Sequence, residues 1–427
     1  MIVIIEKTKD LGGCIKVPPS KSYTHRAIVA SALTKGESKI LEPLYSDDTV
    51  ATINSCKSFG VKIRENEKML IVDGNCKLTA PNKPINCKFS ATTIRFMTAF
   101  AGLVEGKTIL TGEGSLLRRP IYPLIDALKM LGVNCESANG FPPVTIYGGG
   151  VVGGESSIVG DISSQFISAL IFVCPLAEND SLIKLKTPLE SKPYVELTLE
   201  VVKMHGINVK VLGNHESYYI PSNQNYKPYT HKIFGDFSSA SFLIAAAAIT
   251  GSNVKFENLY PLFKSQPDIE IIDTLKRMGI KISCGENYVE VLGGELEGIE
   301  IDAKDTPDLV PIYTVLACYA KGETVIRNVK RLRIKESDRL NTISSELSKM
   351  GAKIKVLENS LIVKGGHKLR GVIINPHGDH RIAMACAVAA LGAEGETVIL
   401  NSNCVRKSYP NFFKDLISIG GKVKIKG

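Results

Sequence analysis

The sequence of 427 residues contains few of the signals that mark metal-binding, secreted or membrane proteins. Its ten cysteines include no C-x-x-C pair, which argues against a zinc site and a disulfide framework, so we expect thiols in a reducing compartment. The longest apolar run, 166–177, is too short to span a bilayer. Residues 1–7 have the pattern of a strand and lack the basic segment and apolar core of a signal peptide. These absences predict a cytoplasmic protein that does not enter a membrane.

Signals of nucleic-acid binding are also scarce. No block of five like charges occurs, and the aromatic residues are not interleaved with arginines as an RNA-binding surface requires. The net charge of +9 favours acidic ligands, but a non-catalytic nucleic-acid-binding protein would need one continuous basic face. With 44% hydrophobic and 22% charged residues the chain is ordinary globular material, and its length predicts two or three domains.

The chain repeats itself six times. In each copy an amphipathic helix ends at a glycine that runs into an alternating, strand-like segment, as in Phe59-Gly60-Val61-Lys62-Ile63. The leading glycines are spaced by 72, 74, 73, 72 and 69 residues. They are Gly60, Gly132, Gly206, Gly279, Gly351 and Gly420. A period of about 70 residues indicates a repeated supersecondary unit.

Each copy also contains an earlier helix that is apolar on nearly all sides, which is the pattern of a buried helix. These helices are expected to begin near Ser22, Thr92, Ser163, Ser238, Asp308 and His380. One buried helix, one surface helix and several strands make an α/β unit of β-α-β-α-β-β order. Six such units exceed one core, so we expect two domains of three units each, with a boundary in the loop-rich stretch 221–229.

Hydroxyl and basic side chains gather where the buried helices begin. The first example is Lys21-Ser22 with Arg26, and the last is Gly378-Asp379-His380-Arg381. A single hydroxyl at such a place is usually only a helix cap. Because a helix N-terminus presents unpaired N–H groups, convergence of several such starts favours an anion-binding site.

At this level of detail the chain resembles a known family over nearly its whole length. The strings that carry the resemblance, in order, are P-S-K-S-x-x-x-R, L-R-R-P-I, S-S-Q-F, S-K-P-Y, P-D-L-V-P, K-E-S-D-R-L and D-H-R-I-A-M. Together they are similar to the 5-enolpyruvylshikimate-3-phosphate (EPSP) synthases. This resemblance implies an α/β fold of two similar domains, each of three βαβαββ-type repeats with buried parallel helices (an inside-out α/β barrel).

The resemblance also implies how the chain is divided and what it does. Residues 16–230 would form the domain that binds shikimate phosphate, and residues 1–15 plus 231–427 the second domain, with the active site in the cleft between them. The family transfers the carboxyvinyl group of phosphoenolpyruvate to the 5-hydroxyl of shikimate 3-phosphate, by addition and then elimination, and releases phosphate. It uses no metal or other cofactor. We expect a monomer whose partners are these two small molecules, without nucleic acid or membrane.

Site residues are carried over by position. Asp308 would be the base that takes the proton of the 5-hydroxyl, Glu336 the acid that protonates the methylene carbon, and Lys21 would assist. The substrate-binding residues implied are Lys21, Ser22, Arg26, Ala91, Arg119, Ser163, Ser164, Gln165, Ser191, Tyr194, Asp308, Lys335, Arg339, Arg381 and Lys407. Without the resemblance, Asp308 would be interpreted as a plain helix cap.

The sequence departs from the family pattern in two places. Phe89 and Ala91 stand where the family usually has Asn and Gly, and Arg331 stands where many members have Asn. A rival is the enolpyruvyl transferase that acts on UDP-N-acetylglucosamine, which has Lys-Asn at the first helix and commonly a cysteine in a loop. Here Lys21-Ser22, Ser163-Ser164-Gln165 and a loop near 116–119 without cysteine favour shikimate 3-phosphate.

Overall fold

The computed structural model describes residues 1–66, 68–74, 77–263 and 266–426 and divides the chain into two compact units. Unit 1 comprises Met1–Ser20 and Phe234–Gly427, and unit 2 comprises Lys21–Ile233. The divisions therefore follow Ser20 and Ile233, where the sequence predicts them after residues 15 and 230.

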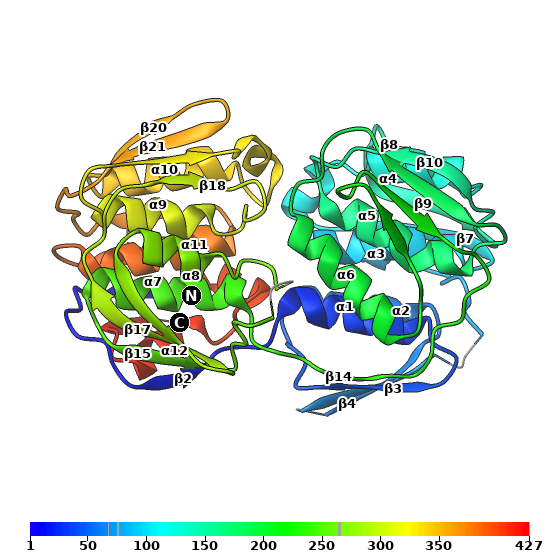
Figure 1. Ribbon diagram of the computed structural model, residues 1–427, viewed down its shortest axis with the longest axis horizontal. Coiled ribbons are helices and arrows are strands. Elements are labelled where there is room, and N and C mark those ends of the chain that lie inside the picture. The colour runs from blue at the N-terminus through cyan, green and yellow to red at the C-terminus, as the bar shows by residue number, and fades with distance from the viewer. Residues whose placement is uncertain (67, 75–76, 264–265, 427) are drawn as a thin grey trace. The chain divides into compact units, whose positions relative to one another are not determined.

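Unit 2 contains three four-stranded sheets within the described residues, together with the first six α-helices (Figure 1). Its elements are α1 (Lys21–Ala32), β3 (Glu37–Leu41), α2 (Asp47–Ser58), β4 (Lys62–Asn66), β5 (Met69–Asp73), β6 (Ile85–Asn86), α3 (Ala91–Gly102), β7 (Gly106–Thr111), η1 (Gly114–Arg118), α4 (Tyr122–Met130), β8 (Asn134–Ala138), β9 (Phe141–Gly148), β10 (Gly154–Ile158), α5 (Ser164–Val173), η2 (Cys174–Leu176), β11 (Ser181–Leu185), α6 (Lys192–Met204), β12 (Lys210–Leu212), β13 (Ser217–Ile220) and β14 (Thr230–Lys232).

Unit 1 has the same content over its described residues, again with three four-stranded sheets. Its elements are β1 (Ile2–Ile5), β2 (Cys14–Lys16), α7 (Phe237–Thr250), β15 (Val254–Glu257), α8 (Ile271–Arg277), β16 (Ile280–Cys284), β17 (Tyr288–Gly294), β18 (Glu300–Asp302), α9 (Val310–Tyr319), β19 (Glu323–Arg327), η3 (Lys330–Ile334), α10 (Arg339–Lys349), β20 (Lys353–Val356), β21 (Ser360–Lys364), β22 (Ile373–Ile374), α11 (His380–Gly392), β23 (Thr397–Ile399), η4 (Ser402–Lys407), α12 (Phe412–Ser418) and β24 (Val423–Lys426).

All six sheets share one pairing pattern. A parallel pair is followed by two antiparallel pairs, as in the order β6-β7-β9-β8, where β6 and β7 are parallel. The chain order β6–α3–β7–α4–β8–β9 is the β-α-β-α-β-β unit that the sequence predicts. The six repeat glycines have φ between +80° and +102°, the left-handed conformation that Gly adopts readily after a helix. The predicted fold class is therefore confirmed.

Two sheets receive a first strand from far away in the sequence. β14 precedes α7 of unit 1 in the chain but pairs with β3 in unit 2, with His231 opposite Ile40. β2 precedes α1 of unit 2 but pairs with β15 in unit 1, with Ile15 opposite Phe256. The sixth sheet is completed by β1, which lies between β23 and β24. Local periodicity cannot reveal these pairings, because each joins segments separated by more than a whole repeat.

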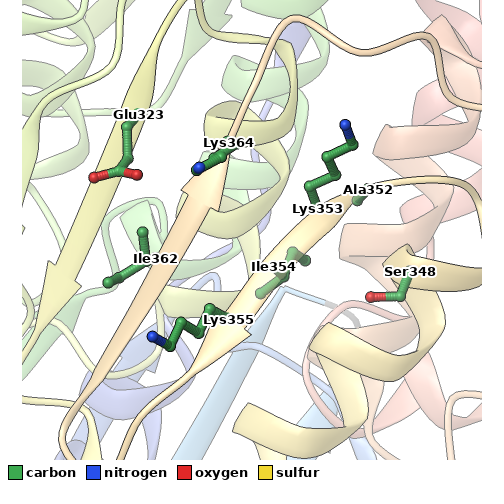
Figure 2. A pocket seen from close by; sticks show the side chains of 8 residues that line it. All are labelled: Glu323, Ser348, Ala352, Lys353, Ile354, Lys355, Ile362 and Lys364. Atoms are coloured by element: carbon green, nitrogen blue, oxygen red, sulfur yellow. The ribbon is translucent and has the colours of Figure 1, made fainter.

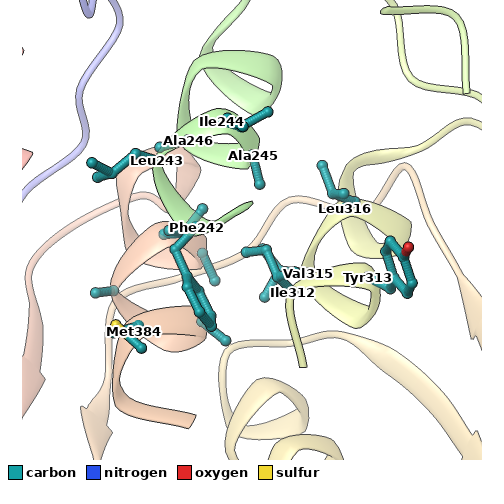
Figure 3. Packing of buried hydrophobic residues seen from close by; sticks show 14 of the residues in the cluster. Phe242, Leu243, Ile244, Ala245, Ala246, Ile312, Tyr313, Val315, Leu316 and Met384 are labelled. Carbon is teal, nitrogen blue, oxygen red and sulfur yellow. The ribbon is translucent and has the colours of Figure 1, made fainter. Parts of the chain in front are cut away.

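The core of unit 1 forms around its three buried helices. α7, α9 and α11 contact one another, and the side chains that meet there include Phe242, Ile312 and Met384 (Figure 3). Residues Phe237–Ala248 of α7 are all buried. The alanine run Ala245–Ala248 leaves room for neighbouring helices to pack closely, which explains a helix with no polar face. In the part of the chain that the structure describes, no helix has the length and apolar character needed to cross a membrane.

Among its described residues unit 2 has four buried histidines, and we expect three of them, His25, His205 and His231, to make the fold sensitive to acid. Burial lowers the pKa of His25 to about 3, that of His205 to about 4 and that of His231 to about 3. The unfolded chain binds protons on these rings below a pH of about 6.5, whereas the folded chain does not. The contribution of these neutral histidines to the free energy of unfolding is thus complete above that pH. It is lost as the pH falls toward their pKa values in the folded chain. At pH 5 the loss is about 2 kcal/mol for each histidine.

This prediction is tested by urea unfolding at pH 7 and pH 5. The variant His25→Gln removes one of the three groups and should reduce the difference between the two free energies of unfolding. His367→Gln, at an exposed position, is the matched control and should leave the difference unchanged. Equal differences in the wild type and in His25→Gln would contradict the prediction.

Candidate functional site

Lys21 begins α1 in unit 2 and is already engaged by a carboxylate. Its Nζ lies 3.1 Å from Oδ2 of Asp48, near the start of α2. The Lys21 side chain is 14% exposed and that of Asp48 is 5% exposed. The pair places a cation at the start of a buried helix, where solvent and a ligand still have access to it.

Arg26, one turn further along α1, is buried and fully engaged inside unit 2. Its guanidinium donates to Thr198 Oγ1 at 2.7 Å, to the Ser22 carbonyl at 2.9 Å and to the Tyr194 carbonyl at 2.9 Å. Burial lowers the pKa of Arg26 to about 9, so it stays charged at neutral pH. Arg26 therefore fixes the backbone of Ser22 and Tyr194, two of the expected ligand-binding residues.

A second arginine, Arg95 on α3, organises the start of α5. Its Nη1 donates to Ser163 Oγ at 2.9 Å and to Gln165 Oε1 at 2.8 Å. Gln165 in turn donates to Thr92 Oγ1 at 2.8 Å, and Ser163 is the N-cap of α5. These contacts orient the side chains of Ser163 and Gln165, two of the predicted substrate-binding residues, at the start of α5.

The remaining residues predicted in unit 2 stand at related positions. Ser164 is the first residue of α5, and Ala91 is the first residue of α3. Ser191 is the N-cap of α6 in a left-handed conformation, with φ of 58°. Arg119 is buried at the end of η1, next to Pro120, whose carbonyl accepts from Arg95. The hydrogen bonds of Arg26 join α1 to α6 and to Ser168 of α5, and those of Arg95 join α3 to the start of α5.

In unit 1 the predicted residues form a tight ionic network. Arg339 Nη1 donates to Asp308 Oδ1 and Arg339 Nη2 donates to Glu336 Oε2, both at 2.8 Å. Arg381 Nη2 reaches Asp308 Oδ2 at 2.8 Å, and Lys407 Nζ reaches Glu336 Oε1 at 3.0 Å. Three cations thus converge on the two carboxylates that the resemblance names as base and acid.

The electrostatics of this network can be traced to individual groups. Burial by itself raises the pKa of Asp308, but Arg381, Arg339 and Lys335 together outweigh burial and hold that pKa well below its ordinary range. Burial by itself lowers the pKa of Arg339. The negative charges of Asp379, Glu336 and Asp308 outweigh burial, so the pKa of Arg339 is raised above its ordinary value. Asp308 is consequently a carboxylate, and Arg339 is a permanent cation.

Asp379 also belongs to this network. The sequence pattern indicates only that it lies at a helix start. It is completely buried, caps α11 by accepting from the Arg381 N–H at 3.0 Å, and accepts from Arg339 Nε at 2.8 Å. Arg95 and Asp48 in unit 2 were likewise not among the predicted site residues. Their roles depend on partners 27 to 70 residues away, and a single sequence carries no signal for such pairs.

Two basic residues lie beside the network. Lys335 follows η3 and acts on Asp308 through its charge. Arg331 is 7% exposed, and its Nη2 donates to the Lys304 carbonyl. Asp308 directly precedes Leu309, the N-cap of α9, so the interpretation of Asp308 as a plain cap is wrong. Within the described ranges no group of three His, Cys, Asp or Glu side chains is placed to hold a metal ion.

A surface hollow of about 540 Å³ lies elsewhere in unit 1 (Figure 2). Its lining contains none of the predicted site residues. The lining residues are Glu323, Ser348, Ala352, Lys353, Ile354, Lys355, Ile362 and Lys364. Lys353 and Lys355 belong to β20, the edge strand of its sheet. Lysines on an edge strand hinder pairing with another chain, which accounts for this basic surface without a ligand.

Comparison with known proteins gives one consistent result. The family model described as EPSP synthase (3-phosphoshikimate 1-carboxyvinyltransferase) matches residues 5–416. A protein of Methanocella arvoryzae named 3-phosphoshikimate 1-carboxyvinyltransferase is 44% identical, with 100% of both chains covered. One of the same name from Methanocaldococcus jannaschii is 40% identical, again over 100% of both. The structure of EPSP synthase from Acinetobacter baumannii superposes with a TM-score of 0.83 at 25% identity, covering 100% of this chain and 99% of that one.

Proposed function

Because the chain belongs to the EPSP synthase family, we propose that it transfers the carboxyvinyl group of phosphoenolpyruvate to the 5-hydroxyl of shikimate 3-phosphate. The products are 5-enolpyruvylshikimate 3-phosphate and phosphate. We place this reaction in the biosynthesis of aromatic amino acids. We also propose that the protein is a monomer and that it is located in the cytoplasm.

The observation that supports the proposal best is the convergence of Arg339, Arg381 and Lys407 on Asp308 and Glu336. Phosphoenolpyruvate has a phosphate and a carboxylate, and arginine recognises such groups with two parallel N–H donors. An acid and a base held among these cations are what an addition–elimination reaction of a dianion requires.

Shikimate 3-phosphate is assigned to the helix starts of unit 2. Ser163, Ser164 and Ser191 would hold its phosphate with Lys21, and Ser22, Arg26 and Tyr194 would help hold the ring and carboxylate. The helix N-termini add partial positive charge. Arg26 and Arg95 contribute by fixing these groups, since both guanidinium groups donate to them or to their backbone.

Phosphoenolpyruvate is assigned to cations of both units, namely Lys21 and Arg119 with Gln165 from unit 2, and Arg339, Arg381 and Lys407 from unit 1. In the addition step Asp308 takes the proton of the 5-hydroxyl while the oxygen bonds to the central carbon of phosphoenolpyruvate. Glu336 gives a proton to the methylene carbon, which becomes a methyl group. In the elimination step the Glu336 carboxylate takes a proton back from this methyl group and the C=C bond forms again, while the C–O bond to phosphate breaks and its electron pair leaves on the phosphate.

Substrate binding should also change the partners of Asp308 and Glu336. A phosphate or carboxylate that reaches Arg339, Arg381 and Lys407 competes with these two residues for the same N–H donors. The substrate would thereby loosen the ion pairs that hold the base and the acid. Both then act on the bound substrate instead of neutralising the arginines.

The direct test is release of phosphate from shikimate 3-phosphate and phosphoenolpyruvate, with each substrate omitted in turn. Release should require both. Replacing shikimate 3-phosphate with UDP-N-acetylglucosamine tests the alternative acceptor, which the comparisons do not favour, and should give no release. Release with the UDP-sugar alone as acceptor would overturn the proposal.

Ala91 leads to a prediction about glyphosate, which in this family occupies the phosphoenolpyruvate site. Ala91 is the first residue of α3 and is 5% exposed. Its methyl group takes space that the usual glycine leaves open, and overpacking of one methyl costs about 1–3 kcal/mol. Glyphosate is longer than phosphoenolpyruvate, so we expect Ala91→Gly to lower its inhibition constant by about 5- to 150-fold.

The measurement is the inhibition constant of the wild type and of Ala91→Gly, with the KM for phosphoenolpyruvate measured in parallel. Phe89→Asn is the companion variant. The Phe89 ring is 46% exposed and lies over Gly114, where a Cβ would come within 2.7 Å of ring carbon Cε1. If Ala91→Gly is no more sensitive than the wild type, the methyl group is not the cause.

A further inference from the structure

A chain of buried hydrogen bonds in unit 2 leads to the first turn of α1. Nδ1 of His205 lies 2.8 Å from the Lys227 carbonyl, and Nε2 of His205 lies 2.8 Å from Nε2 of His231. Nδ1 of His231 lies 3.2 Å from the Tyr23 hydroxyl. His205 and His231 are completely buried and Tyr23 is 3% exposed. None of these side chains belongs to the anion-binding groups described above.

The partners determine where each proton lies. A carbonyl only accepts, so His205 carries its proton on Nδ1, and its Nε2 is an acceptor. Only one proton fits between the two Nε2 atoms, and it therefore belongs to His231. Nδ1 of His231 is then an acceptor for the Tyr23 hydroxyl, which donates to this nitrogen at 3.2 Å in preference to the Met204 sulfur, a weaker acceptor at 3.6 Å. Thr34 agrees with this assignment, because its Oγ1 lies 3.2 Å from His205 Nδ1 while its own proton goes to the Ala30 carbonyl.

The chain joins three elements of unit 2. His205 is the C-cap of α6, and its backbone carbonyl also accepts from the Lys227 N–H at 2.8 Å. His231 lies on β14, whose register against β3 is fixed by strand pairing. Tyr23 lies in the first turn of α1, two residues after Lys21 and one after Ser22. The hydroxyl of Tyr23 is thus one point, beside the contacts of Arg26, at which α6 and β14 hold the start of α1.

We propose that Tyr23, His231 and His205 are positioning residues that hold Lys21 and Ser22 in the geometry needed to bind shikimate 3-phosphate. The proposal rests on the proposed function, since it takes Lys21 and Ser22 as ligand-binding groups. Tyr23 does not touch the substrate; it acts through the backbone of its own helical turn. A buried hydrogen bond that leaves its partner unsatisfied when removed is strong enough to change this geometry.

The principal test is Tyr23→Phe, which removes the hydroxyl and keeps the ring. We expect the KM for shikimate 3-phosphate to rise about three- to tenfold, with kcat changed by less than about twofold. A purely structural role would lower the melting temperature and the active fraction but leave KM unchanged. Tyr229→Phe is the matched control, since the Tyr229 ring packs on both histidines at centroid distances of 6.0 and 4.9 Å, outside the hydrogen-bond chain.

Two further measurements keep the proposal open to refutation. His231→Asn retains an acceptor near the position of Nδ1 for the Tyr23 hydroxyl, whereas His231→Leu does not. The KM for shikimate 3-phosphate should therefore be smaller in His231→Asn than in His231→Leu. Nitrogen NMR of the wild type should show a protonated Nδ1 on His205 and a protonated Nε2 on His231. An unchanged KM in folded Tyr23→Phe, or the opposite tautomers, would overturn the inference. Absence of phosphate release by the wild type would instead refute the proposed function.

Discussion

Replacing Glu336 by glutamine should lower kcat by about 10²-fold or more, because general acid catalysis typically contributes 10²- to 10⁴-fold. Glutamine keeps the size of the side chain and one oxygen for Arg339 or Lys407, which lie 2.8 and 3.0 Å from the carboxylate. The glutamine amide is not acidic enough to protonate the methylene carbon. Binding of shikimate 3-phosphate should stay nearly unchanged, since that substrate is assigned to unit 2.

Steady-state phosphate release gives kcat, and calorimetric titration gives the affinity for shikimate 3-phosphate. Glu358→Gln is the matched control: it makes the same chemical change in an exposed pair with Lys330, away from the ionic network. That variant should retain wild-type kcat. Near-normal turnover in Glu336→Gln would remove Glu336 from the proposed mechanism.

Replacing Arg339 by leucine should have the largest effect on stability. Arg339 is 1% exposed and forms ion pairs of 2.8 Å with Asp308, Glu336 and Asp379. Removing the shared cation leaves the buried carboxylates without their main partner, and breaking a buried pair in this way costs about 3–5 kcal/mol. Activity should be lost as well, because Arg339 is assigned to phosphoenolpyruvate.

Urea unfolding followed by circular dichroism measures the free energy of unfolding of this variant. Arg327→Leu is the control, because Arg327 pairs with Glu300 on the surface, where the side chains are 55% and 60% exposed. An exposed pair of this kind contributes little to the free energy of unfolding, because solvent screens the two charges. If Arg339→Leu and Arg327→Leu lose the same free energy, the buried network does not stabilise unit 1.

The sequence was most informative where a local pattern repeats. Glycines such as Gly60 and Gly206 follow amphipathic helices, and their left-handed conformation is confirmed. Segments that are apolar on nearly all sides, such as 240–249, predict the buried helices, because a helix without a polar face is stable only inside a core. The content of each repeat could therefore be predicted without any knowledge of tertiary structure.

The sequence could not predict which side chains and strands from different elements contact one another. Asp379 caps its own helix, which is a local property, but it also meets Arg339 forty residues earlier. The hydrogen bond between His205 and His231 joins the end of a helix to a strand. The exchange of β2 and β14 likewise depends on which sheet has an open edge. Each of these is decided by packing between elements, and periodicity describes only single elements.

The position of β1 has a consequence for synthesis on the ribosome. β1 is made before the other elements described here, yet within the described residues its partners are β23 and β24, more than 390 residues later. Residues 6–396 must be translated before the first of these partners begins to appear. At about 5–20 residues per second this takes roughly 20–80 s. Unit 2, which is continuous from Lys21 to Ile233, can fold on the emerging chain, whereas unit 1 must wait until β24 has been made. During that interval the apolar strand Ile2–Ile5 is a segment that chaperones would need to shield.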